Sequence, residues 1–349
     1  MRRSPSGLLR GAVGIGISLV FVYLALRGVD LTRTWALLQQ ARAEWLVLAA
    51  AAVVGDLGFR ALRWQELMKP VRHVGLRRLT GYMLIGYLAN NLLPARLGEL
   101  VRSHYLGDRE GISRSATLGT VVVERVVDTV VLVGIGALAI LVLNIRGVVA
   151  SAVLVGVAVS GLLVVALAAA LAAHRLPGAR RAAAWLEQWP RIHGVATRLR
   201  GGLMVAANPR TLFLATALSV AAWTCTVVMV LAAGQALGIQ LTVGEGALLA
   251  AGTNLATAIP SGPGYLGTFE YAGQVIAVAF GLAASDGLAL ALMIHVLALV
   301  ISSTGGGVAL FRLGWSRRTA VHPATTAVAA NGAEAEPEPA SAEETPAPG

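Results

Sequence analysis

The chain has 349 residues, of which 56% are hydrophobic and only 13% are charged, and its mean hydropathy is +0.71. Soluble domains of this size are usually about a quarter charged, so the composition excludes an ordinary globular domain and indicates a membrane protein. The net charge of +10 would also suit a nucleic-acid-binding protein. The arginines, however, lie between apolar stretches, where membrane topology places them. We therefore expect no nucleic-acid partner.

Six apolar stretches resemble membrane-spanning helices, and most approach the ~20 residues that such a helix needs. They are Gly11–Val29, Trp45–Phe59, Val126–Leu143, Val148–Ala173, Thr211–Ala233 and Gly287–Phe311. The second stretch is short unless it extends to about Arg63. Trp45 and Trp64 flank it, as interfacial anchors would.

The basic residues predict the orientation of these spans. Most of them precede the first stretch or lie in Arg60–Arg78, Arg96–Arg114, Arg175–Arg210 and Arg312–Arg318. The positive-inside rule makes these segments cytoplasmic, and six spans then place both termini on the same side. We expect a multi-pass protein of a bacterial-type inner (plasma) membrane with both termini in the cytoplasm.

Two further segments, Gly81–Arg102 and Gly246–Phe280, are broken at their centres by polar residues, glycine and proline. The breaking residues are Asn90, Asn91 and Pro94 in the first segment, and Asn254, Pro260, Gly264 and Gly267 in the second. Broken backbone at membrane depth is tolerated only where it is buried in protein or lines a water-filled cavity. We interpret both segments as re-entrant hairpins.

Each hairpin follows one span and precedes another, so the two halves of the chain share one order of elements. Glu99 also precedes Arg125 by nearly the same interval as Glu270 precedes His295. The predicted topology puts the hairpins on opposite sides, which is the pattern of an inverted repeat, and paired broken segments point to a transporter's binding site. The predicted fold class is an all-α polytopic membrane protein with about six spanning helices and two re-entrant hairpins in an inverted repeat.

The strongest local signal is VVVERVVDTV at Val121–Val130, where Glu124, Arg125 and Asp128 interrupt an apolar helix. Glu124 and Asp128 share a helix face, and Arg125 can reach Asp128 three residues on. Ionisable groups within a span cost roughly 2.5–3.5 kcal/mol each, so they face the protein interior and have partners. These three could form a structural ion-pair network or a substrate site, and we favour the site.

The hairpins offer two kinds of chemistry. Glu99 and Glu270 could act in a binding site, or each could cap a helix N-terminus, whose dipole favours a carboxylate. Free N–H groups at the Gly- and Pro-rich tips could bind phosphate or carboxylate. The glycines could equally serve only tight turns and close packing.

The remaining motifs give weaker evidence of function than the hairpins and the charged helix. The G-x-G-x-x-G pattern at Gly262–Gly267 lies between membrane helices, so it lacks the strand that a dinucleotide site needs. The six histidines show no metal-ligand spacing, and we expect no metal or cofactor. His295 could carry protons or simply be packed in a helix. No pairing of a nucleophile with a base is readable, so we assign no catalytic residue.

Three segments resemble signatures of the lysylphosphatidylglycerol synthase transmembrane, or flippase-like, family. They are NNLLPARLGELVR (Asn90–Arg102), VVVERVVDTVVL (Val121–Leu132) and IPSGPGYLGTFEY (Ile259–Tyr271). The similarity runs from about Gly11 to Arg318 and implies a lipid flippase-like membrane domain over residues 1–318. The second half of the chain has no clear counterpart of the Glu124–Arg125 pair, because His295 stands alone at the corresponding place.

In the best-known members of that family the membrane domain is fused to a soluble domain that aminoacylates phosphatidylglycerol. Here residues 319–349 form an acidic tail rich in Ala, Pro and Glu, which we expect to be disordered. The resemblance therefore argues against lysyl transfer by this chain, and an enzymatic activity is not expected.

The leading hypothesis is that the protein binds or translocates a membrane lipid, with an anionic or phosphate-bearing headgroup. The alternatives are a membrane-embedded lipid or glycolipid transferase and a non-transporting scaffold. A separate synthase or glycosyltransferase could act with it. The candidate substrate-binding residues are Asn90, Asn91, Pro94, Gly98, Glu99, Arg102, Glu124, Arg125, Asp128, Asn254, Pro260, Gly264, Gly267, Glu270 and His295.

Overall fold

The computed structural model describes residues 5–93, 97–172, 188–259 and 261–320. Within these ranges the secondary structure is helical and contains no strand, which confirms the all-α prediction. The helices are α1 (Pro5–Leu26), α2 (Leu31–Gln39), α3 (Ala43–Met68), α4 (Leu76–Leu92), α5 (Gly98–Glu110), α6 (Arg114–Leu143), α7 (Val148–Ala172), α9 (Pro190–Leu203), η2 (Met204–Ala207), α10 (Pro209–Ala236), α11 (Val243–Ala256), η3 (Pro263–Tyr265), α12 (Thr268–Ala279) and α13 (Ala284–Ala320). The proposed boundary at residue 318 stays a prediction, and nearly all of the acidic tail lies outside the described residues.

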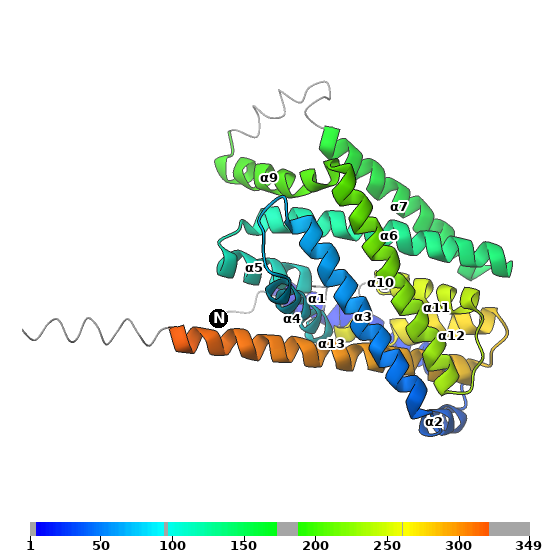
Figure 1. Cartoon of the computed structure of the whole chain (residues 1–349). Helices are drawn as coiled ribbons and strands as arrows, with labels where there is room; N and C mark the ends of the chain where they lie inside the picture. Colours follow the sequence, from blue (N-terminus) through cyan, green and yellow to red (C-terminus); the bar gives the residue numbers. More distant parts are fainter. Residues whose placement is uncertain (1–4, 94–96, 173–187, 260, 321–349) are drawn as a thin grey trace, which may run out of the picture.

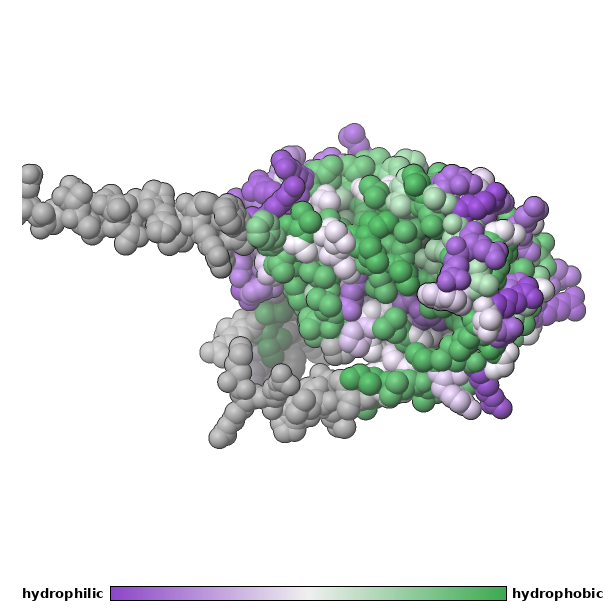
Figure 2. Space-filling view, turned by 90° about the horizontal axis from the view of Figure 1, so that it is seen from below, coloured by the Kyte–Doolittle hydropathy of each residue, from purple (hydrophilic) through white to green (hydrophobic). Residues whose placement is uncertain are grey.

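Five of these helices are long and apolar enough to cross a membrane, namely α3, α6, α7, α10 and α13. The first predicted span corresponds to α1, which bends by 89° into α2, and this pair counts as a sixth span if it is taken as one. On the face that Figure 2 shows, apolar side chains form a band across the middle, with hydrophilic ones toward both ends. The protein is thus a multi-pass membrane protein.

Two spans are longer than the apolar pattern predicts. Helix α6 begins at Arg114 and not near Val126, so the charged residues of this helix lie well inside it. Helix α3 continues to Met68, which places Arg60 and Arg63 on a membrane helix and not in the cytoplasmic segment to which we assigned them. Trp64 is completely buried, so its predicted role as an interfacial anchor is wrong. The helix continues beyond the apolar run because its polar side chains find partners inside the protein.

The two broken segments form helix–break–helix units. The first pairs α4 with α5, and the second pairs α11 with α12 across η3. The α4–α5 contact depends on glycine, because a Cβ on Gly98 would lie 2.0 Å from the carbonyl oxygen of Gly86. The first hairpin does not end at Arg102 as predicted but continues to Glu110. Figure 1 shows the two units toward opposite ends of the bundle.

The helices of the two halves pack across each other. Helix α3 makes its most extensive contact with α10. Helix α4 packs against α13, and helix α11 packs against α6. The first arm of each hairpin therefore lies against the last spanning helix of the other half, so neither half forms a separate unit.

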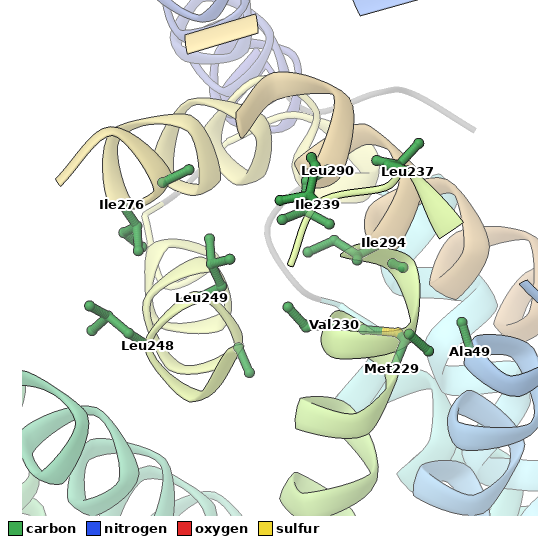
Figure 3. Packing of buried hydrophobic residues seen from close by; sticks show 14 of the residues in the cluster. Ala49, Met229, Val230, Leu237, Ile239, Leu248, Leu249, Ile276, Leu290 and Ile294 are labelled. Carbon is green, nitrogen blue, oxygen red and sulfur yellow. The ribbon is translucent and has the colours of Figure 1, made fainter. Parts of the chain in front are cut away.

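The largest apolar cluster fills the space between α3, α10, α11, α12 and α13 (Figure 3). The side chains of this cluster hold the second hairpin against its neighbouring helices, because protein interiors are closely packed. Its labelled members in Figure 3 are Ala49, Met229, Val230, Leu237, Ile239, Leu248, Leu249, Ile276, Leu290 and Ile294.

Candidate functional site

A cavity of about 950 Å³ lies where the tips of the two hairpins meet. The tips are in contact, since a Cβ on Gly264 would lie 3.5 Å from the backbone oxygen of Asn91. One part of the cavity wall is polar or charged and comes from α3, α4, α5 and α6. The rest is mostly apolar and includes Val148 to Leu163 of α7. The polar lining residues on that first part are Asp56, Arg60, Tyr87, Asn90, Asn91, Glu99, Arg125, Asp128 and Thr129.

Glu124 lies behind this charged wall and is 1% exposed. Its carboxylate accepts hydrogen bonds from three arginines, at 3.0 Å from Arg63, 3.0 Å from Arg102 and 2.6 Å from Arg125. These arginines come from three different helices, α3, α5 and α6. A buried charge persists only when it is paired and hydrogen-bonded, and Glu124 meets both conditions.

Asp128, one helical turn further along α6, forms the second centre of the network. Its carboxylate accepts hydrogen bonds from Arg63, from Arg60 at 3.3 Å and from the indole Nε1 of Trp223 at 3.2 Å. The predicted contact with Arg125 is present at 3.6 Å. The network therefore connects α3, α6 and α10, which are three of the spanning helices.

Two arginines of the network also lie over aromatic rings. Arg60 donates through Nε to both oxygens of Asp56 at 2.8 Å, and its guanidinium lies 4.5 Å from the ring centroid of Trp223. Arg102 lies 4.8 Å from the ring centroid of Trp64. Such cation–π contacts favour the charged state of the cation in a site with little water.

The arginines differ in their access to the cavity. Arg63 and Arg102 are buried, whereas Arg60 and Arg125 line the cavity. Glu99 lines it as well, and its Oε2 is buried without a hydrogen-bond partner among the described residues. The cavity wall thus contains Arg60, which is bound to Asp56 and Asp128, and it contains Arg125 and Glu99, of which Nε and Oε2 respectively have no hydrogen-bond partner among the described residues.

The first N–H groups of both hairpin helices are already bound. The N–H of Gly98 donates to Asn90 Oδ1 at 2.7 Å, and the N–H of Gly267 donates to Glu270 Oε2 at 2.7 Å. Glu270 therefore has the capping role that we gave as one alternative, whereas no such bond to Glu99 is present among the described residues. These two N–H groups are not free for a phosphate.

The asparagines Asn91 and Asn254 of the two hairpins have different hydrogen-bond partners. Asn91 donates to the hydroxyls of Ser302 at 3.1 Å and Ser303 at 2.9 Å, which ties the first hairpin to α13. Asn254 donates to the backbone oxygen of Ala250 in its own helix at 2.9 Å. Both line the cavity. Pro94 and Pro260, which we also included in the site, lie outside the described residues.

His295 is not alone, contrary to our interpretation of the second half. Its Nδ1 lies 2.5 Å from Glu270 Oε1, and both residues are 5% exposed. The ring of Phe269 stacks on the imidazole with a centroid distance of 4.3 Å. His295 also lines the cavity, so the structure brings a pair formed by Glu270 of the second hairpin and His295 of α13 to the site that holds the arginines of the first half.

Four residues of the site were not predicted from the sequence, namely Asp56, Arg60, Arg63 and Trp223. A signal for the first three existed, because positions 56, 60 and 63 share one face of a helix. Trp223 gave no such signal, since a tryptophan in an apolar span is ordinary. The structure therefore keeps the predicted group of Arg102, Glu124, Arg125 and Asp128 together and adds these four residues to it.

Comparisons with known proteins place the chain among membrane proteins. It is 26% identical over 355 residues to the glycosyltransferase AglD of Haloferax volcanii, in an alignment that covers 89% of this chain and 56% of AglD. It is 27% identical over 118 residues to the UPF0104 membrane protein MJ1595 of Methanocaldococcus jannaschii, which covers 33% of this chain and 35% of that protein. The chain thus spans little more than half of the length of AglD and about a third of the length of MJ1595. No solved structure matches the chain.

The family model described as the lysylphosphatidylglycerol synthase TM region matches residues 11–306. This range contains both hairpins, the arginine network and the Glu270–His295 pair. The family assignment agrees with the resemblance of the three sequence segments. The chain is therefore a member of the lysylphosphatidylglycerol synthase TM region family.

Proposed function

We propose that the cavity binds a membrane lipid with an anionic or phosphate-bearing headgroup, and that the protein moves this lipid between the leaflets. The observation that carries the proposal is the composition of the cavity wall. Arginines and carboxylates line one part, and apolar side chains line most of the rest. A lipid has the same division between headgroup and tails, and the family assignment supports a function on membrane lipids.

The headgroup would bind to Arg60 and Arg125. Both guanidinium groups line the cavity, and arginine stays charged and presents a planar set of donors that suits a phosphate or carboxylate. The N–H groups of Gly98 and Gly267 at the hairpins already donate to side chains of the protein. We therefore assign headgroup binding to the arginines and not to the hairpin tips. The unpartnered oxygen of Glu99 would accept a hydrogen bond from a hydroxyl or ammonium group of the same headgroup.

The tails would lie along α7. This helix supplies Val148, Val149, Val153, Val159 and Leu163 to the cavity wall, and it is the least buried of the five spans. A wall of this kind presents aliphatic side chains to the cavity and to the surrounding bilayer. It therefore suits acyl or prenyl chains, which gain nothing from polar contacts.

Lipid movement would result from motion of the two halves of the protein relative to each other. The packing of α4 on α13 and of α11 on α6 supports the inverted repeat that we infer from the sequence. Rocking of such halves around a site at their interface is the usual route of alternating access. We further propose that the protein lies in a bacterial-type inner membrane with both termini in the cytoplasm, which the distribution of basic residues supports.

The test is lipid translocation by purified protein in phosphatidylcholine vesicles that contain fluorescent phosphatidylglycerol. Loss of a charged hydrogen bond removes about 1.5–3 kcal/mol, so Arg125→Ala should slow translocation by about tenfold or more. Arg125→Lys keeps the charge without the planar donors, so its translocation rate should lie between those of the wild type and Arg125→Ala. Arg146→Ala, which removes an exposed arginine of the α6–α7 loop, is the matched control. Equal rates for wild type and Arg125→Ala would refute the proposal.

A membrane-embedded transferase is the second candidate. Two observations favour it. AglD, to which the chain is similar, is a glycosyltransferase, and in the Glu270–His295 pair a carboxylate orients an imidazole next to a cavity. A labelled nucleotide sugar supplied to protein in lipid vesicles would decide. Transfer of the label to lipid, with loss in His295→Gln, would establish the transferase, and an unlabelled lipid fraction would exclude it for that donor.

A further inference from the structure

The Glu270–His295 pair is the part of the cavity wall that lipid binding, as proposed above, leaves without a role. His295 comes from α13 and faces the cavity, and Glu270 comes from α12 and lies behind it. Because Nδ1 of His295 lies against Glu270, Nε2 is the ring nitrogen that remains for the cavity. The stacked ring of Phe269 covers one face of the imidazole.

Glu270 is held from a second side. Its Oε2 accepts the N–H of Gly267, whose φ of +86° needs glycine. A Cβ at Gly267 would lie 2.7 Å from Ser18 O and 2.7 Å from Val22 N, so this turn is packed directly on α1. The carboxylate is thereby fixed between α1 and α13. A change of charge on His295 therefore acts on a contact that joins the second hairpin to the last helix.

The basic side chains that the two halves contribute to the cavity wall differ in their ability to exchange a proton. Arginine is not deprotonated in proteins, so Arg60 and Arg125 keep their charge. Histidine changes its charge near neutral pH, and its pairing with a carboxylate leaves one ring nitrogen to gain or lose a proton. The second half of the cavity wall therefore adds an imidazole, which is charged only when protonated, to a wall whose cations in the first half, Arg60 and Arg125, are permanently charged.

The surroundings of the pair are defined by the same cavity. The described lining residues from α1, α7, α10 and α11 carry no ionisable side chain, which leaves the pair to face groups from the other elements. The charged and titratable groups that share the cavity with it are Asp56 and Arg60 of α3, Tyr87 of α4, Glu99 of α5, Arg125 and Asp128 of α6, Tyr265 of η3, and Tyr271 of α12.

We propose that the Glu270–His295 pair is a proton-binding site that loads one proton together with the anionic headgroup, so that a proton gradient drives the lipid across the membrane. Nε2 takes the proton from water on one side, and the imidazolium stays beside Glu270 and the headgroup during the crossing. The proton then returns to water on the other side. One proton and a singly negative headgroup cross without net charge. This inference rests on the proposed lipid movement.

The test uses full-length protein in phosphatidylcholine vesicles with fluorescent phosphatidylglycerol and a pH difference across the membrane. One proton per lipid allows up to about a tenfold enrichment of the lipid in the leaflet on the alkaline side per pH unit, because one unit equals a tenfold change in an equilibrium constant. His295→Gln and Glu270→Gln should abolish the enrichment, and Glu270→Gln keeps an acceptor for the N–H of Gly267. His104→Gln, at an exposed histidine of α5, should retain it.

A second measurement guards against variants that do not fold. Wild-type protein in weakly buffered detergent solution should take up about one proton for each phosphatidylglycerol bound, as followed with a pH indicator dye. Translocation without enrichment or proton uptake in the wild type would overturn the inference and leave the proposed function intact. Absence of both lipid binding and translocation would overturn the two together.

Discussion

Glu124 shows how a full negative charge is kept inside a membrane helix. Three guanidinium groups donate to its carboxylate, and each also has another carboxylate, hydroxyl or aromatic partner nearby. The pairing offsets the large desolvation penalty that an isolated charge would carry. The same side chain connects α3, α5 and α6, so its chemistry and its structural role cannot be separated by position alone.

Substitution of Glu124 should therefore be costly. Glu124→Gln leaves the buried Arg63 and Arg102 and the partly exposed Arg125 with one carboxylate fewer, and removal of one partner from a buried ion pair costs about 3–5 kcal/mol. We expect a clearly lower unfolding temperature in detergent, measured by differential scanning fluorimetry.

Glu44→Gln is the matched control. Glu44 lies at the start of α3 with a mostly exposed side chain, 4.0 Å from Arg42. An exposed pair of this kind contributes about 0–1 kcal/mol, so the unfolding temperature should hardly change. Similar losses in both variants would mean that the buried network does not stabilise the fold.

Glu124, Arg125 and Asp128 of this network could be predicted from the sequence, whereas Arg60 and Arg63 were missed although they share a helix face. Glu124 and Asp128 stand out because they interrupt an apolar helix. Arg60 and Arg63 follow an apolar run, where the positive-inside rule assigns arginines to the cytoplasm. Only the packing of α3 against α6 and α10 shows that they turn inward.

At the scale of elements, the two hairpins depend on close approaches of backbone. In the first, Gly86 and Gly98 let α4 and α5 touch, and this contact positions Glu99 and Arg102 on α5. Asn90 closes the break by accepting the N–H of Gly98. The position of α5 relative to the cavity thus depends on these two glycines.

Gly98→Ala should disturb this hairpin. The added methyl would lie 2.0 Å from the oxygen of Gly86 and 2.6 Å from the side chain of Asn90, and overpacking of this kind costs about 1–3 kcal/mol. We expect a lower unfolding temperature and slower lipid translocation. Gly134→Ala in α6, whose Cβ would meet nothing within 4 Å, should leave both unchanged or raise the stability slightly. Equal behaviour of the two variants would contradict the close α4–α5 contact.

The breaks of both hairpins were predictable because Asn, Pro and Gly clusters interrupt apolar sequence. The length of α5 and the separate helix α2 were not. Both are short and α5 is also polar on average, so the apolar pattern that identifies spans does not detect them. Their helical state depends on the neighbours against which they pack, α4 and α6 for α5 and α13 for α2.

At the scale of the whole molecule, the cavity is assembled from residues that lie far apart in the chain. Arg60, Arg125 and His295 come from three different spans, and no local pattern predicts that they share one wall. The sequence does predict that two broken segments belong together, because the order of elements repeats. The inverted repeat itself stays a prediction that the packing pairs support.

The central claim is that this cavity holds a lipid at its arginine wall. Native mass spectrometry of protein extracted with its lipids, wild type beside Arg125→Ala and Arg146→Ala, tests it most directly. The account predicts one class of anionic lipid bound to the wild type and to Arg146→Ala, and its loss in Arg125→Ala. The same unselective set of lipids on all three proteins would contradict the account and leave Arg125 with a structural role only.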